Sequence, residues 1–190
     1  FTAAMANAIR GGASEPLKAE FFDGANAARS GELIASALGN AFLGFALSLL
    51  VISPFLDKIG AKRIVLFAAA CFVVGPILMI VAPMADGFDA KYALLTAGMI
   101  ATGFGWGATE GLINSLTITI YPEDKTGRLN ILHAWWPFGI IIGGLLSVLL
   151  LGAGVDWRIL VALLAIPGII LAIWTMQHEF PQTESTVAGV

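Results

Sequence analysis

Apolar residues occur in long, nearly uninterrupted stretches along the chain, and short polar segments separate them. A helix needs about 20 such residues to cross the roughly 30 Å hydrocarbon core of a bilayer. Stretches near that length occupy residues 33–52, 64–85, 92–121, 129–153 and 159–174, the last slightly short. A further stretch begins at Phe1, and we expect it to be a helix cut at its N-terminus. The pattern predicts an all-α membrane protein with six transmembrane helices.

The polar connections, such as residues 57–63 and 121–128, are too short to hold a soluble domain. We therefore expect one six-helix transmembrane bundle over residues 1–176. The polar segment 177–190 then reads as the start of a linker to a missing C-terminal bundle.

Composition agrees with a lipid environment. Hydrophobic residues make up 58% of the chain and charged residues 12%, and the mean hydropathy is +0.87. A soluble domain carries roughly 25% charged residues. The net charge is −3 without any basic block, which argues against a nucleic-acid partner. Cys71 is the single cysteine, so an internal disulfide and a multi-cysteine metal site are excluded, and we predict no cofactor.

Lysine and arginine indicate the orientation in the membrane, because cytoplasmic loops carry an excess of both. One set of alternating loops holds Lys58, Lys62, Arg63, Lys125 and Arg128, and the other holds Lys18, Arg29, Lys91 and Arg158. The first set is slightly larger and denser. We therefore predict a multi-pass plasma-membrane protein with loops 57–63 and 121–128 in the cytoplasm.

Glu110 is the single charged side chain between residues 92 and 121. It lies about 11 residues, roughly 16 Å of helix, from the cytoplasmic end, near mid-membrane. An ionised carboxylate is costly there, so it should face a water-filled cavity, find a partner or bind a proton. Helical spacing places it on one face with Gly103, Trp106, Gly107, Asn114 and Thr117. This face predicts a wall that binds substrate and a proton; the alternative is a carboxylate fixed in a hydrogen bond to another helix.

Two polar residues in other apolar segments are further candidates. Arg10 is expected to pair with Glu110 in the empty site or to bind the solute, unless it is an interfacial cation that snorkels to the membrane surface. Asn40 is a secondary candidate for solute binding, and a hydrogen bond between helices is the alternative.

The beginning of the fifth segment contains Asn130, His133, Trp135 and Trp136. Tryptophan rings can stack on a solute, but they also anchor helices at the membrane interface, and we favour the anchor for one of this pair. His133 has no second histidine or carboxylate one turn away. It therefore favours a hydrogen-bonding or gating role over metal binding.

The connection 53–63 resembles the G-x-L-x-D-R-x-G-R-R/K signature of the major facilitator superfamily. The matching residues are Asp57, Lys58, Gly60, Lys62 and Arg63, whereas Ser53 and Ala61 depart from the pattern. The resemblance implies that this loop helps to control alternation between inward-open and outward-open states. Gly60 would allow a tight turn there.

A second stretch, over residues 103–114, 121–123 and 127–133, resembles helix four, the short loop and helix five of the sugar branch related to fucose and glucose/galactose permeases. Two departures matter. Residues 99–101 stand where many proton-coupled members carry an arginine, and Gly143 and Gly144 replace the glycine–proline pair of antiporters. The usual arginine is therefore not available for coupling, and drug efflux is disfavoured.

The resemblance implies the N-terminal half of a transporter, built from two inverted three-helix repeats whose first helices line the cavity. The expected function is secondary active transport of a small polar solute such as a sugar, with proton or cation coupling through Glu110. An intramembrane enzyme using Glu110 and His133 is an alternative, but the chain has no G-x-S-x-G or H-E-x-x-H motif. A structural or channel-like membrane subunit is the third interpretation.

Overall fold

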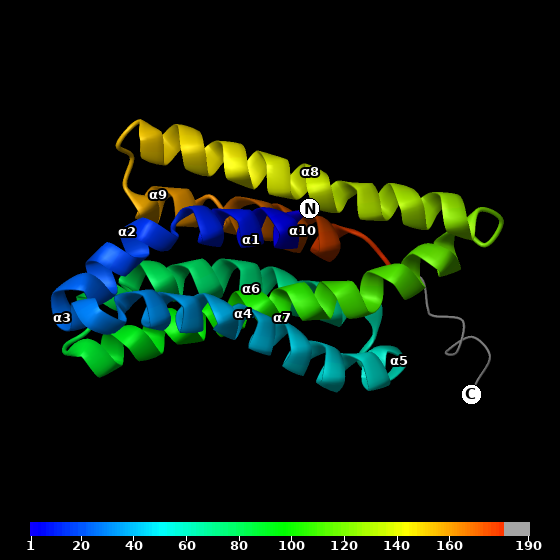
Figure 1. Cartoon of the computed structure of the whole chain (residues 1–190). Helices are drawn as coiled ribbons and strands as arrows, with labels where there is room; N and C mark the ends of the chain where they lie inside the picture. Colours follow the sequence, from blue (N-terminus) through cyan, green and yellow to red (C-terminus); the bar gives the residue numbers. More distant parts are fainter. Residues whose placement is uncertain (181–190) are drawn as a thin grey trace.

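The protein is a bundle of helices that lie side by side with roughly aligned axes (Figure 1). The computed structural model describes residues 1–180, and this part of the chain contains no strand. The main helices are α1 (Thr2–Gly12), α4 (Ser30–Ile52), α6 (Ala61–Val81), α7 (Phe88–Ile120), α8 (Lys125–Gly152), α9 (Trp157–Ala162) and α10 (Ala165–Gln177).

Shorter helical pieces join them. Between α1 and α4 the chain forms α2 (Ser14–Lys18), the π-helix η1 (Ala19–Asp23), α3 (Gly24–Asn26) and the 3-10 helix η2 (Ala27–Arg29). The remaining short elements are η3 (Ser53–Phe55), α5 (Leu56–Ile59) and η4 (Ala82–Met84).

Among residues 1–180, four helical stretches are long and apolar enough to cross a membrane: Ala27–Ile59, Ala61–Met84, Lys125–Gly152 and Trp157–Gln177. Helix α7 has 33 residues, but its glycines, threonines and Glu110 make it less apolar than these four. Helix α1 spans 11 residues in the part of the chain described. The predicted all-helical fold is thus confirmed for residues 1–180, and length and hydropathy give four candidate membrane spans there instead of the six predicted.

The segment predicted as one helix over 159–174 is divided in two. Helix α9 ends at Ala162 and α10 begins at Ala165. Pro167 has no amide hydrogen, so it cannot donate to the Leu163 carbonyl one turn earlier. That carbonyl instead accepts from the Ile166 amide at 3.3 Å, over three residues. The prolines of α6 and α8 lie inside helices that continue through them.

Glycine residues let α7 approach two neighbouring helices closely. A Cβ atom at Gly103 would collide with the Ala41 carbonyl of α4. On another side of α7, a Cβ at Gly98 would lie 2.7 Å from the Gly75 carbonyl of α6. In lipid, such small residues allow the backbone contacts that hold helices together. Helix α7 is therefore packed between α4 and α6.

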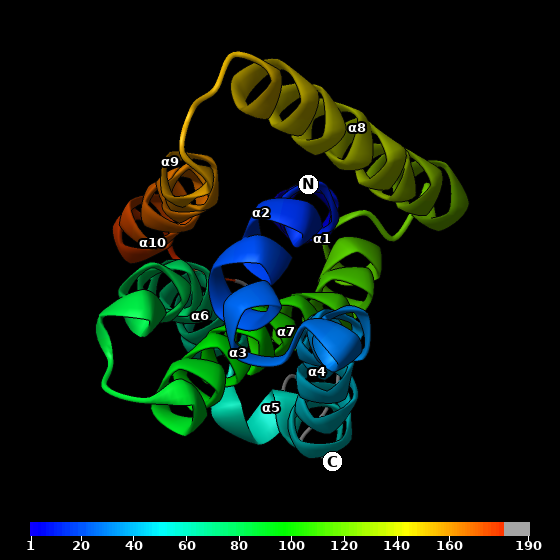
Figure 2. The same ribbon diagram turned by 60° about the vertical axis from the view of Figure 1, so that its left-hand side comes forward.

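Helix α8 packs on α1 through small residues of both helices. A Cβ at Gly143 would lie 2.7 Å from the Met5 carbonyl and 2.9 Å from the Ala8 Cβ, and a Cβ at Gly139 would lie 2.6 Å from the Phe1 carbonyl. Gly139 and Gly143 therefore let the backbones of α1 and α8 approach closely. Figure 2 shows α1 lying between α8 and the other helices.

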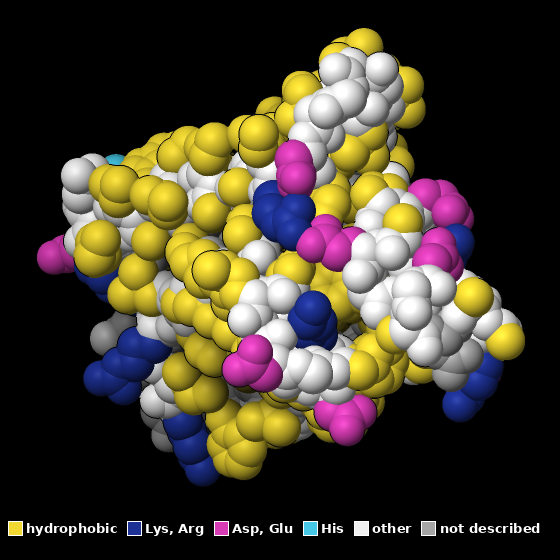
Figure 3. Space-filling view, turned by 90° about the vertical axis from the view of Figure 1, so that its left-hand side faces the viewer, with side chains coloured by type: hydrophobic (Ala, Val, Ile, Leu, Met, Phe, Trp, Pro, Cys, Tyr) yellow, Lys and Arg dark blue, Asp and Glu magenta, His cyan; other side chains and the backbone are white. Residues whose placement is uncertain are grey.

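Charged side chains gather at the end of the bundle formed by α2, α3 and the start of α9, and the flanks around it are mostly apolar (Figure 3). Arg158 forms ion pairs there with Glu20 and Asp156. The Trp157 indole Nε1 also donates to Glu20 Oε2 at 2.7 Å. These contacts connect η1, in the segment after α1, to the start of α9.

Candidate functional site

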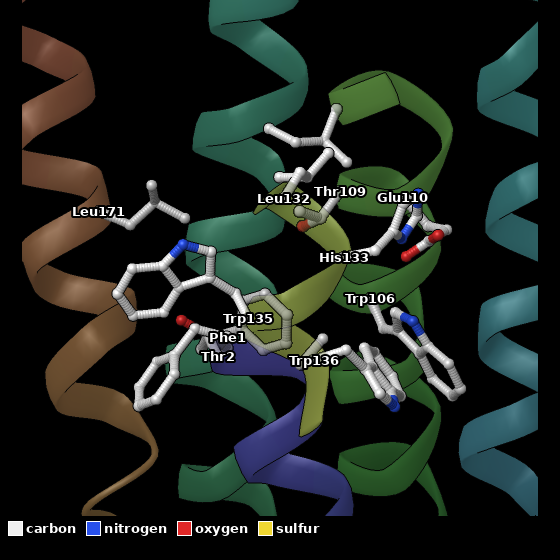
Figure 4. A pocket seen from close by; sticks show the side chains of 13 residues that line it. Phe1, Thr2, Trp106, Thr109, Glu110, Leu132, His133, Trp135, Trp136 and Leu171 are labelled. Atoms are coloured by element: carbon white, nitrogen blue, oxygen red, sulfur yellow. The ribbon is translucent and has the colours of Figure 1, made fainter. Parts of the chain in front are cut away.

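A cavity of about 250 Å³ opens between the start of α1, the middle of α7 and the first half of α8 (Figure 4). Helices α6 and α10 contribute one residue each. Its lining consists of Phe1, Thr2, Ala3, Phe72, Trp106, Thr109, Glu110, Ile113, Leu132, His133, Trp135, Trp136 and Leu171.

The cavity brings together four residues that the sequence singled out. Trp106 and Glu110 come from α7, and His133 and Trp136 come from α8. Glu110 is half-buried. Within residues 1–180 it forms neither a hydrogen bond nor an ion pair, so the alternative of a carboxylate fixed by another helix does not apply in this structure. A half-buried carboxylate on a cavity wall is suited to bind a proton or to accept a hydrogen bond from a solute hydroxyl.

Trp106 lies in an aromatic cluster that joins three helices. Its ring centroid lies 4.1 Å from that of Phe45 on α4 and 5.1 Å from that of Trp136 on α8, both at an interplanar angle of 32°. Phe42 adds an edge contact at 5.6 Å. The Trp106 Nε1 is buried, with no acceptor among the described residues. The cluster therefore fixes Trp106 and leaves its N–H without a partner.

The polar face predicted on α7 is narrower than expected. Gly103 and Gly107 pack against α4 and do not line the cavity. Thr117 donates to the Ile113 carbonyl of its own helix at 2.8 Å. Asn114 also lies outside the cavity lining, and its buried Oδ1 has no donor within the described part of the chain.

Arg10 is not brought to Glu110, so the prediction that these two pair is wrong for this structure. Its side chain is 3% exposed, and Nη1 donates to Thr102 Oγ1 at 2.8 Å. Thr102 Oγ1 donates in turn to the Met99 carbonyl at 2.8 Å. The physical reason is distance along the helix: Arg10 lies about 12 Å along α1 from Thr2, which does line the cavity. Burial also excludes the snorkelling alternative.

Two other candidates stay away from the cavity. Asn40 donates from Nδ2 to the Ser36 carbonyl of its own helix at 2.9 Å. Asn130 is exposed near the start of α8. For Asn40, the hydrogen bond is therefore made within one helix instead of between two.

The loop 57–63 forms a turn that contacts the end of α10. Gly60 has φ +85°, which favours glycine, as the resemblance implied. Lys62 Nζ donates to the carbonyls of Met176 at 3.2 Å and His178 at 3.0 Å. Lys58 Nζ lies 5.8 Å from the Phe55 ring centroid. Asp57 and Arg63 are exposed on the same turn.

Sequence reasoning missed Thr109 and Phe45. Thr109 lines the cavity between Trp106 and Glu110, and helical spacing would have placed it beside them. Phe45 supports Trp106 from α4, and no signal in the sequence connects these two residues. In the part of the chain that the structure describes, no three His, Cys, Asp or Glu side chains are grouped as a metal site.

Comparisons with known proteins agree with this arrangement. The sequence model of the family described as "Sugar (and other) transporter" matches residues 8–180. The chain is 26% identical over 144 residues to a D-xylose transporter of Levilactobacillus brevis, covering 75% of this chain and 29% of that protein. It is 26% identical over 151 residues to the glucose transporter GlcP of Staphylococcus epidermidis, covering 78% and 31%.

A third relative is polyol transporter 5 of Arabidopsis thaliana, 30% identical over 120 residues, covering 62% of this chain and 21% of that protein. The chain thus spans less than a third of the length of these relatives. Because the family match extends over most of the chain, from the end of α1 to the end of the described residues, this chain belongs to the sugar transporter family of the major facilitator superfamily.

Proposed function

We propose that the protein containing this chain is a secondary active transporter of a sugar. The observation that carries the proposal is a cavity, inside a bundle with an apolar exterior, that combines aromatic rings with Glu110 and His133. Pockets that bind small molecules combine mostly apolar walls with a few polar groups in this way. The names of the relatives, which are xylose, polyol and glucose transporters, support a sugar as the solute.

In this proposal, residues 1–176 cross the plasma membrane six times as the N-terminal bundle. The crossings are α1 with α2, then α4, α6, α7, α8, and α9 with α10. A second bundle covers the cavity, and rocking of the two bundles exposes the solute to each side in turn. The lipid bilayer surrounds both. Loops 57–63 and 121–128, which lie at the same end of the bundle, face the cytoplasm.

Glu110 is the proposed coupling residue, because it is half-buried on the cavity and forms no hydrogen bond or ion pair among residues 1–180. Full-length protein in liposomes should take up labelled D-xylose or D-glucose faster when the outside is acidified. Glu110→Gln should abolish this dependence while leaving sugar exchange in the absence of a proton gradient. Glu15→Gln, which changes an exposed carboxylate far from the cavity, is the matched control. Unchanged proton dependence in Glu110→Gln would remove Glu110 from coupling and leave another cation as the partner.

The two competing functions predict different results in the same preparation. An intramembrane enzyme would convert a substrate without moving a solute, and a structural subunit would do neither. The match to a transporter family argues against the enzyme. Sugar uptake by the purified protein would exclude both alternatives.

A further inference from the structure

We infer that Trp136 is a stacking platform for the ring of a cyclic sugar, and that Trp106 is the residue that positions it. This inference rests on the proposed function. It assigns a binding role to one face of an indole ring and a supporting role to a second indole beneath it.

The two tryptophans differ in what their rings can still contact. Trp106 packs on Phe45 at 4.1 Å and on Trp136 at 5.1 Å between ring centroids, so its faces are engaged by protein. Trp136 has an aromatic neighbour on the side of Trp106 and also lines the cavity. Figure 4 shows the two rings next to each other at the cavity. Trp136 is therefore the member of the pair with ring surface left for a solute.

Trp136 also differs from the tryptophan next to it in the sequence. Trp135 also lines the cavity, but it is 51% exposed and its ring makes edge contacts with Phe1 of the chain start and Phe138 of its own helix. Trp136 is half-buried, and it is held from α7 through Trp106. A rigid aromatic surface binds a partner at a low entropic cost, because it is already in place before the partner arrives.

Polar groups surround this platform at the spacing of one helical turn. Glu110 follows Trp106 by four residues on α7, and His133 precedes Trp136 by three on α8, so both lie near the rings. The buried Nε1 of Trp106 lacks an acceptor among the described residues. A pyranose ring presents C–H groups on its faces and hydroxyl groups around its edge. Its faces match the Trp136 indole, and its hydroxyl groups match the side chains of Glu110 and His133.

The size of the cavity and the flat shape of the Trp136 ring narrow the class of solute further. At about 250 Å³ the cavity lies just below the range of roughly 300–1,000 Å³ for drug-sized ligands, which suits a monosaccharide. A rigid ring gains more from a flat platform than an open-chain polyol does, because the polyol has to be ordered first. We therefore expect a cyclic pentose or hexose to bind better than the acyclic polyol with the same number of carbons.

The experiment measures D-xylose uptake by the full-length protein in liposomes, with xylitol as the competitor of equal carbon number. For Trp136→Ala, the KM for D-xylose should rise about threefold to tenfold with little change in kcat, as expected for the loss of one aromatic contact. The preference for D-xylose over xylitol should shrink by the same factor. Trp136→Phe should restore most of both. Trp174→Ala, an exposed tryptophan on α10 outside this cavity, is the control for folding and insertion.

The role of Trp106 is tested through its effect on Trp136. Trp106→Ala should raise the KM like Trp136→Ala, and the double variant should be no worse than either single one, because the two residues act as one unit. An unchanged KM and unchanged preference in correctly inserted Trp136→Ala would overturn the platform while sugar transport itself stands. Absence of sugar uptake by the wild-type protein would instead overturn the proposed function.

Discussion

Arg10 is a charged side chain in the interior of the bundle, and its one described hydrogen bond is to a neutral hydroxyl. A guanidinium carries five N–H donors and is costly to bury without acceptors. The Thr102 hydroxyl accepts a hydrogen bond from Arg10 and donates one to the Met99 carbonyl, so it links the buried guanidinium to the backbone of α7.

Thr102→Val should lower the free energy of unfolding by about 1–3 kcal/mol, because it leaves an Arg10 donor buried without its acceptor. The measurement is thermal unfolding of the purified protein in detergent. Thr96→Val is the matched control on the same helix, because the Thr96 hydroxyl oxygen is buried without a partner in the described residues. Equal destabilisation by the two substitutions would contradict a special role for the Arg10–Thr102 contact.

For individual residues, the sequence predicted which side chains share a face of one helix, but it did not predict contacts between residues of different helices. The spacing on α7 predicted that Trp106 and Glu110 share one face, and both line the cavity, although Gly103, Gly107, Asn114 and Thr117 of the same predicted face do not. The Arg10–Thr102 bond joins residues 92 positions apart, and it depends on which helices are neighbours and at what height they cross. The sequence pattern does not contain that information.

Helices α1 and α8 pack closely because both have small side chains, or none, at their contact. Ala8 faces Gly143, and Gly12 faces Ser147, so each helix offers small residues to the other at four-residue intervals. Close packing replaces the hydrophobic effect between such helices. Adding a methyl group on the face of α8 that contacts α1 should therefore lower the stability of the protein, whereas adding one on another face of α8 should not.

Gly143→Ala should destabilise the protein by about 1–3 kcal/mol, since its Cβ would meet the Met5 carbonyl and the Ala8 side chain. Gly144→Ala adds the same atom one residue later, where nothing lies within 4 Å. The melting temperatures of the two variants in detergent should differ clearly. Similar melting temperatures would show that α1 and α8 do not approach as closely as described.

The boundaries of most helices were predictable from the apolar runs, because length in a bilayer is set by the hydrocarbon thickness. The segment 33–52 compares with α4 at Ser30–Ile52, for example. The division between α9 and α10 was not predictable in the same way. Pro167 lies in the first turn of α10 just after the division, whereas α6 and α8 continue through Pro76 and Pro137, so a proline in the sequence does not by itself predict where a helix divides.

For the whole molecule, the arrangement places loops 57–63 and 121–128 at one end and the segment that contains α2 and α3 at the other (Figure 1). Cysteine labelling tests the proposed orientation in the membrane. In a Cys71→Ala background, Lys58→Cys and Lys125→Cys should react with a membrane-impermeant reagent only in inverted vesicles. Glu15→Cys should react in intact cells. Labelling of all three from the same side would contradict the topology.

The last pair of helices has a contact to an earlier part of the chain at each end. At the start of α9, Arg158 forms an ion pair with Glu20, and at the end of α10 the carbonyls of Met176 and His178 accept hydrogen bonds from Lys62. Contacts at both ends of the α9–α10 pair resist sliding of this pair relative to the segment after α1 and to the start of α6. In the proposed transport cycle, α9 and α10 should therefore move together with the segment after α1 and with the start of α6, and relative motion should occur elsewhere in the bundle.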